Sequence, residues 1–151
     1  MKIVSDFTIS QGLLMALIQI LERGKNLNQS LQQFCDVVSK FSISGHPFSI
    51  RVSFKGKFWT NKNFTETLIF QRNDFQTPDH KSGTIEIFFP VLSDNSLLDQ
   101  LIADGNKMLQ QLIPILNSLI SKFQLDELYR YTIEREKELK SINQTAEILK
   151  K

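Results

Sequence analysis

Two adjoining segments, Phe48-Ser-Ile-Arg-Val-Ser-Phe54 and Lys57-Phe-Trp-Thr60, decide the fold class of this 151-residue chain. In the first segment apolar and polar residues alternate, and this period of two predicts a strand with one buried face. Gly56 lies between the segments and suits a tight turn, so the second segment is expected to pair back as a short antiparallel strand. The sequence therefore predicts a β-hairpin near the middle of the chain.

Two further strands are predicted after this hairpin. Residues 67–75 form the first of them, with Leu68 and Phe70 on one face, and residues 84–89 form the second, which Pro90 ends. Only a short loop separates the two segments, and short connections join antiparallel neighbours. The central part of the chain is therefore expected to be an antiparallel meander.

Two helices are predicted ahead of the hairpin. Residues 10–23 repeat apolar side chains at steps of three and four, which is the pattern of a helix with one buried stripe. A second helix is expected to start at Asn26, which can cap its N-terminus. It should end near Gly45, because Pro47 disfavours a helical conformation in the residue before it.

From Asn95 onward the sequence is helical almost throughout, with Gly105 and Pro114 as weak points. Pro114 is expected to kink the helix, because proline removes one backbone hydrogen bond. Two apolar stripes run side by side, whereas packing on a sheet needs only one. Leaving the second stripe in water would forgo about 1.5–3 kcal/mol for each side chain. The second stripe therefore predicts a dimer interface, made by Leu101, Met108, Leu112, Ile115 and Leu119.

The character of the sequence changes after Phe123. Residues 124–151 carry six acidic and six basic side chains, and their apolar residues follow the three-and-four spacing of a coiled coil, interrupted by Thr132 and Arg135. This spacing extends the expected homodimer interface to Leu125, Leu128, Leu139 and Ile142. We therefore expect an α+β domain over residues 1–123 and a C-terminal helix over residues 124–151 that links it to a further module of a longer protein.

Composition and charge exclude several classes of function. The 18 basic and 16 acidic residues give a formal charge of +2, too small for strong attraction to nucleic acid or anionic lipid. The longest apolar run, residues 13–21, is interrupted by Gln19 and is too short to span a bilayer. No signal peptide is evident. These features predict a soluble, cytoplasmic setting.

No catalytic or metal site is expected. One cysteine and two histidines are too few for a disulfide framework or a conventional zinc site. His46 and His80 fall in predicted loops, and Cys35 lies beside an apolar helical stripe, where a buried inert thiol is favoured over a nucleophile. The carboxylates are scattered and no glycine-rich phosphate loop is present. We therefore expect a protein that is not itself an enzyme.

The hairpin has two competing interpretations. It contains basic residues interleaved with aromatic ones: Arg51, Lys55, Lys57, Lys62, Phe54, Phe58 and Trp59. Aromatic stacking beside a basic groove would suit a nucleic-acid-binding module. The alternation instead places Phe54 in the core, and isolated positive charges commonly protect an exposed sheet edge. The second interpretation is favoured, so nucleic acid is not the expected partner.

A second candidate site follows the hairpin. Trp59, Asn63, Phe64 and Thr67 are expected to fold over one end of the sheet, because exposing both aromatic rings would be costly. They would either line a pocket for a small ligand or plug that end of the sheet. The plug is the favoured alternative.

One further motif combines Thr60, Asn63, Phe64, Glu66 and Thr67 with the later strand Gly83-Thr-Ile-Glu-Ile-Phe-Phe89. This motif resembles that of the GAF-like sensory domains of bacterial signalling proteins. The resemblance covers residues 10–123. It implies an antiparallel sheet with helices packed on one face, a sensory role without catalysis, and a ligand or cofactor that the sequence does not identify.

The C-terminal segment Glu138-Leu-Lys-Ser-Ile-Asn-Gln-Thr-Ala-Glu-Ile-Leu149 resembles the linker helices of sensor histidine kinases. This resemblance implies an input domain of a two-component system, with a kinase core or a second sensor module downstream in the same polypeptide. The expected mechanism is a small bias between two arrangements of the exit helix.

Overall fold

The computed structural model describes the backbone of residues 4–91 and 95–150 and the side chains of residues 4–91 and 96–145. Its elements are α1 (Gln11–Arg23), α2 (Leu27–Ser39), β1 (Ser49–Phe54), β2 (Lys57–Thr60), β3 (Phe70–Gln76), β4 (Ser82–Phe88), a 3₁₀ turn (Asn95–Leu97) and α3 (Leu98–Lys150). The order and types of these elements confirm the predicted α+β class. Asn26 caps α2 as predicted, because its side chain accepts a hydrogen bond from the Gln29 backbone N–H at 2.8 Å.

The four strands form one antiparallel sheet in the order β2-β1-β4-β3. The predicted meander is therefore wrong, because β1 pairs with β4 and β2 does not pair with β3. Lys55 and Gly56 make the β1–β2 turn with φ angles of +51° and +75°, a region that glycine reaches at little cost. In the register of the sheet, Val52 faces Trp59 on β2 and Ile85 on β4. One face of the sheet is therefore apolar along β2, β1 and β4, whereas β3 contributes Asn73 to it.

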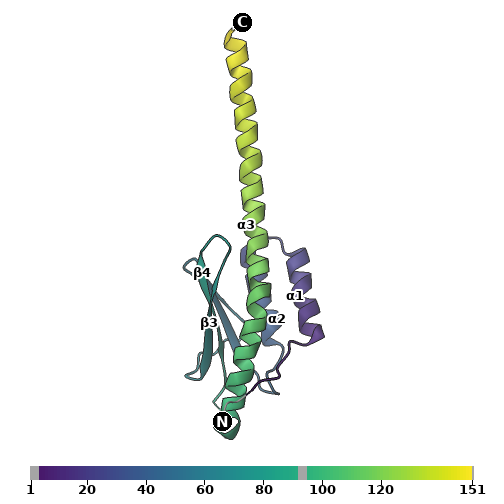
Figure 1. Cartoon of the computed structure of the whole chain (residues 1–151), viewed down its shortest axis with the longest axis vertical. Coiled ribbons are helices and arrows are strands. Elements are labelled where there is room, and N and C mark those ends of the chain that lie inside the picture. Colours follow the sequence, from purple (N-terminus) through teal and green to yellow (C-terminus); the bar gives the residue numbers. More distant parts are fainter. Residues whose placement is uncertain (1–3, 92–94, 151) are drawn as a thin grey trace.

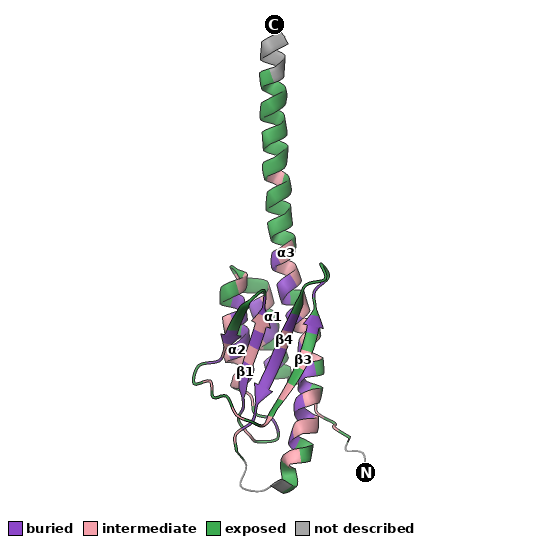
Figure 2. Cartoon of the chain, turned by 90° about the vertical axis from the view of Figure 1, so that its left-hand side faces the viewer, coloured by how far each residue is buried: buried purple, intermediate pink, exposed green. Residues whose placement is uncertain are grey.

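All three helices lie on this apolar side of the sheet, in two layers (Figure 1). α2 packs on β1 and β2, α3 packs on β3 and β4, and α1 packs on α2 and α3 rather than on the strands. The core is formed where these layers meet, and its largest fully buried side chains include Phe34, Phe89, Leu13, Leu17, Leu31, Ile43, Ile50, Ile85 and Ile87. Among the described residues, no helix lies on the opposite face of the sheet (Figure 2).

α3 is a single helix of 53 residues with two different surroundings. Its first half lies against the domain, and from residue 124 onward it extends into solvent and is exposed along most of its length (Figure 2). The helix continues through both expected weak points, Gly105 and Pro114. A Cβ atom at Gly105 would come within 2.6 Å of the Phe89 ring and 2.9 Å of Ile87. Gly105 therefore permits α3 to lie close to β4.

The expectation that one stripe of α3 would be left uncovered is wrong. Leu101, Met108, Leu112 and Leu119 are at most 2% exposed within the single chain, and Ile115 is half-buried. The physical reason is the layered packing, in which α3 contacts the sheet on one side and α1 and α2 on another. Because these side chains are already covered within one chain, their apolar character no longer predicts a dimer interface at this position.

Two boundaries also differ from those predicted. α2 ends at Ser39, earlier than the expected end near Gly45, and residues 40–48 make a loop in which Ser44 and Gly45 have φ angles of +52° and +79°. β3 begins at Phe70 and not at residue 67, because the Thr67 hydroxyl donates to the carbonyl of Phe89 at 2.6 Å. At Thr67 this side-chain contact takes the place of strand pairing, while the Phe89 N–H donates to the Ile69 carbonyl at 2.9 Å.

Candidate functional site

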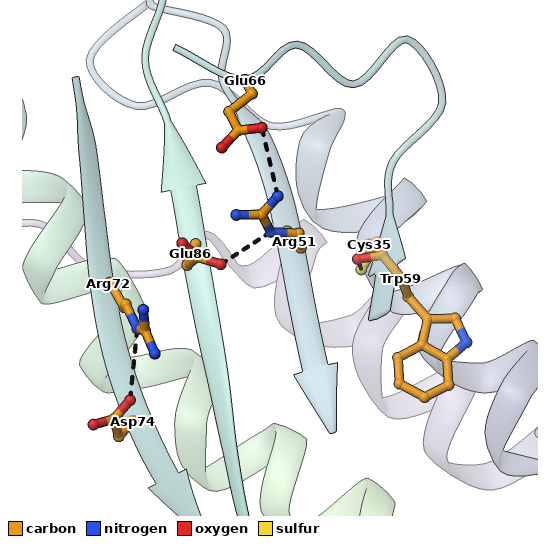
Figure 3. Close-up of polar contacts among 7 residues, drawn as sticks. All are labelled: Cys35, Arg51, Trp59, Glu66, Arg72, Asp74 and Glu86. Atoms are coloured by element: carbon orange, nitrogen blue, oxygen red, sulfur yellow. Dashed lines mark hydrogen bonds and ion pairs between the residues drawn. The ribbon is translucent and has the colours of Figure 1, made fainter. Parts of the chain in front are cut away.

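The uncovered face of the sheet carries an ordered charged row. Glu86 on β4 faces Arg51 on β1 and Arg72 on β3 in the register of the sheet. The Arg51 Nε donates to a Glu86 carboxylate oxygen at 3.0 Å, and a Glu66 oxygen lies 3.8 Å from an Arg51 Nη (Figure 3). The hydrogen bond with Glu86 raises the pKa of Arg51 above its ordinary value. The Arg51–Glu86 pair in this row is therefore a fixed, charge-assisted contact on an otherwise open face.

Aromatic rings hold Arg51 from a second direction. Its guanidinium carbon lies 5.1 Å from the centre of the Phe88 ring and 5.7 Å from that of Phe64. The Phe64 and Phe88 rings meet edge to face, with their centres 5.3 Å apart. Because the pair with Glu86 and the two rings act together, Arg51 has little freedom to turn toward solvent.

Beside the charged row the sheet has a hollow of about 620 Å³. Ser53 and Thr84 provide its floor, and Lys55, Phe58, Arg72 and Asp74 stand around it. Small side chains at the centre and larger ones at the edges make this region concave. We call it the sheet hollow.

The sheet hollow reaches α3 through the β3–β4 hairpin tip, residues 77–81. The Lys81 ammonium lies 3.4 Å from an Asp79 oxygen, and the Gln124 amide of α3 donates to Asp79 at 3.1 Å. Lys81 in turn lies close enough to Lys55, at the edge of the hollow, to lower the pKa of Lys55. A chain of polar contacts thus connects the hollow with the point where α3 leaves the domain.

The other side of α3 is held at the same level by the end of α1. The Lys122 ammonium donates a short hydrogen bond to the carbonyl of Leu21 at 2.5 Å, in the last turn of α1. The neighbouring Phe123 ring packs close to Gly24, where an added Cβ atom would lie 3.2 Å from the ring. The exit of α3 is therefore supported by two separate elements.

The four residues predicted to line a ligand pocket are not brought together. Trp59 is buried against the helices and donates from its indole nitrogen to Asn28 on α2 at 2.8 Å. Phe64 lies on the opposite face of the sheet, against Phe88, and Figure 3 shows Trp59 pointing away from the Arg51–Glu86 pair. Asn63 and Thr67 border a separate hollow of about 420 Å³. Trp59 and Phe64 therefore do not face a common cavity.

The basic and aromatic residues of the hairpin are also divided between the two faces. Phe54 and Trp59 are buried, so neither ring can stack on a base while the domain is folded. Arg51 is paired with Glu86. Only Phe58, at 69% exposure, offers an aromatic surface to solvent from this set. The arrangement gives no support to the nucleic-acid alternative.

Cys35 has the surroundings of a structural thiol. It is fully buried on α2, and its sulfur lies 3.5 Å from the carbonyl oxygen of Trp59. Burial, reinforced by the nearby Asp36, raises the pKa of Cys35 to about 12, so the reactive thiolate is disfavoured. This agrees with the inert role expected from the sequence.

A buried carboxylate that the sequence analysis did not single out joins three distant segments. Asp104 on α3 accepts hydrogen bonds from the hydroxyls of Ser5 at 2.6 Å and Ser44 at 2.7 Å, and from the Gln100 amide at 3.0 Å. Burial alone would raise the pKa of Asp104, but these hydrogen bonds outweigh it and the pKa is lowered. Asp104 thus fastens the N-terminal segment and the α2–β1 loop to α3.

The exit segment, residues 124–150 of α3, keeps the remaining predicted interface residues in solvent. Leu125, Leu128, Leu139 and Ile142 are all more than half exposed. Leu125 follows the buried Phe123 by two residues, which is about 200° around a helix. The apolar seam of the exit segment therefore starts on the side of α3 that faces away from the domain.

Comparisons with models of protein families, with curated proteins and with solved structures found no match to this chain. The resemblance to GAF-like domains therefore stays a prediction. No helix within the described residues combines the length and the apolar character needed to cross a bilayer.

Proposed function

We propose that this chain is a non-catalytic sensory or regulatory input domain of GAF-like type, which passes its state to a downstream module through α3. The observation that carries the proposal is that α3 belongs both to the core of the domain and to the segment that extends from it. Its first half contributes Leu101, Met108, Leu112 and Leu119 to the core, and its second half leaves the domain without a break. A change in the domain that moves the first half must also move the second.

The contacts around the exit supply a physical route for such a change. The hairpin tip reaches α3 through Asp79 and Gln124, and the end of α1 reaches it through Leu21 and Lys122. A ligand that favours one position of the hairpin tip would favour one position of the exit segment, by at most its difference in binding free energy between the two positions. In a bacterial two-component protein, a kinase core or a second sensor module would respond to the position of the exit segment.

We further propose that the exit segments of two chains pair in parallel. Their exposed seam faces away from the domain, so the two domains would lie on the outside of the pair. Thr132 and Arg135 interrupt the seam and should keep the pairing weak. A weak coiled coil can change its packing at a cost that a ligand can supply.

Cysteine cross-linking tests the relay directly. With Cys35→Ala and Leu139→Cys introduced into the full chain, the rate of oxidative cross-linking reports how the exit segments meet. Gly105→Ala, 34 positions away, should change that rate several-fold, because its Cβ would press on Phe89 and Ile87. Lys107→Ala is the matched control, since Lys107 is exposed on the same helix.

Equal rates in the Gly105 and Lys107 variants, with both folded by circular dichroism, would refute the relay. Should Gly105→Ala fail to fold, Asp79→Asn at the hairpin tip replaces it, with the same expected direction. A chain that sediments as a monomer at about 100 μM would refute the dimeric form of the proposal.

A further inference from the structure

The sheet hollow has the size and the chemical variety of a small-molecule site. Its volume of about 620 Å³ falls within the range of roughly 300–1,000 Å³ that is usual for ligand pockets, although the hollow is shallow and open to solvent. It lies on the face that no helix covers, so a ligand reaches it without any opening of the core. Most of its lining lies on the four strands, and Lys55 and Gly56 come from the β1–β2 turn.

The floor of the hollow offers free hydrogen-bonding groups. Ser53 and Thr84 face each other across β1 and β4. Within the described part of the chain, neither hydroxyl has a side-chain hydrogen bond, although both can donate and accept. Phe58 stands beside them with most of its ring in solvent. A ligand in the hollow would satisfy the hydroxyls and cover the ring.

The charges around the hollow are of both signs and only loosely paired. Arg72 and Asp74 are two residues apart on β3, with the Arg72 Nε and an Asp74 oxygen 3.8 Å apart and both side chains more than half exposed. Such a pair contributes little to stability, so separating its partners costs little. Arg51 and Glu86 are by contrast committed to each other at 3.0 Å. Arg72 and Asp74 are therefore available to a ligand.

Lys55 gives the hollow an excess of positive charge. Its lining includes Arg51, Lys55 and Arg72 against Asp74 and Glu86, a net charge of +1. Lys81 stands beside Lys55, and this neighbouring ammonium lowers the pKa of Lys55. Asp79 offsets Lys81. Glu127 also acts on both lysines, and the Lys55 ammonium lies 5.4 Å from the centre of the Phe54 ring. A negative group of a ligand next to Lys55 would add to the carboxylates of Asp79 and Glu127.

From this pattern of charges and hydroxyls we propose that the sheet hollow binds an acidic α-amino acid. Arg72 binds one carboxylate of the ligand, Asp74 binds its ammonium group and Lys55 binds its second carboxylate. Ser53 and Thr84 hydrogen-bond to the ligand from below, and its methylene groups lie against Phe58. The ligand's net charge of −1 then balances the +1 of the hollow. This inference rests on the proposed function, since it names the ligand of the proposed input domain.

Isothermal titration of the full chain with three related probes tests the assignment at constant ionic strength. L-glutamate carries all three groups, glutarate lacks the ammonium group, and L-glutamine lacks the second carboxylate. Glutamate should bind most tightly, with each of the other two weaker by about tenfold, the effect of losing one charge-assisted contact. Equal binding of all three, or no heat with glutamate at 10 mM, would overturn the proposal.

Two variants identify which residue reads which group. Asp74→Asn should abolish the preference for glutamate over glutarate and leave the preference over glutamine. Lys55→Gln should do the reverse. Lys140→Gln, an exposed change of the same kind on the exit segment, is the matched control and should leave all three affinities unchanged. Variants that keep both preferences would overturn the assignment even if glutamate binds.

The cross-linking assay separates failure of this inference from failure of the proposed function. Glutamate that binds with the expected preferences but leaves the Leu139→Cys cross-linking rate unchanged supports the ligand and contradicts the relay. A domain that relays the Gly105→Ala change but does not bind glutamate supports the relay and contradicts the ligand.

Discussion

The two halves of α3 are both helical, but different interactions stabilise the helix in each half. Residues 98–123 are helical within a core that buries Leu112, Leu116 and Ile120 completely. Residues 124–145 have no such core, and their leucines are exposed. Most helical stability in proteins comes from packing, and isolated helices are marginal in water. The second half therefore depends on its continuity with the first, or on a partner.

Hydrogen exchange should give the largest contrast between the halves. In dilute, monomeric protein, backbone amides of residues 102–123 should exchange only through global unfolding, which costs about 5–15 kcal/mol in typical domains. Amides beyond residue 128 should open at a cost of at most about 2 kcal/mol, because only helix fraying is needed. Protection of the second half that rises with protein concentration would identify pairing. Equal, concentration-independent protection in both halves would contradict the comparison.

Leucine truncation should sharpen the contrast. Leu112→Ala removes a fully buried side chain and should lower the free energy of unfolding by about 2–5 kcal/mol. Leu139→Ala makes the same chemical change at an exposed position and should stay within about 0.5 kcal/mol in the monomer. Urea denaturation measures both variants. A comparable loss in the two would mean that the exit segment contacts the domain in solution.

Removing the Asp104 carboxylate should have a smaller effect. Asp104→Ala leaves the hydroxyls of Ser5 and Ser44 without their acceptor and should cost about 1–3 kcal/mol at pH 7. Because folding lowers the pKa of Asp104, this contribution is complete above the unfolded pKa of about 4 and is lost as the pH falls through the lowered value. Unfolding measured between pH 7 and pH 2.5 should therefore show wild type and variant converging in acid. If the difference in unfolding free energy between wild type and variant instead grew in acid, folding would raise the pKa of Asp104 rather than lower it.

The smallest effect is expected where the halves meet. Gln124→Ala removes one exposed hydrogen bond to Asp79 and should change the free energy of unfolding by less than about 1 kcal/mol. It should nevertheless speed hydrogen exchange in the hairpin tip, residues 77–81, with little change at Leu112. Lys140→Ala, a truncation farther along the same helix, is the control and should leave the hairpin tip unaffected.

Local patterns in the sequence predicted most of the elements. The alternation in residues 48–54, the turn at Gly56 and the cap at Asn26 are each confirmed by the structure. These features depend on neighbours in the chain, so the sequence carries them directly. The end of α2 was missed because the positive φ angles at Ser44 and Gly45 belong to a loop that Asp104, a distant residue, helps to hold.

The site was harder to predict because it depends on pairing between distant strands. The hairpin register places Trp59 opposite Val52, so the burial of Trp59 could have been derived from the turn alone. The Arg51–Glu86 pair needs the adjacency of β1 and β4, which no local pattern encodes. The covered second stripe of α3 likewise required knowing that α1 packs on α3 and not on the sheet. Long-range contacts decided each of these points.

The unbroken length of α3 has a mechanical consequence. Residues 124–150 extend about 40 Å beyond the domain at 1.5 Å per residue, while the contacts that fix their direction lie at Lys122, Phe123 and Gln124. A tilt of about 5° at this pivot would displace the far end by about 3.5 Å, more than half a helical turn. Side-chain movements of a few tenths of an ångström at Asp79 or Leu21 would thus be amplified into a displacement that a following module can read.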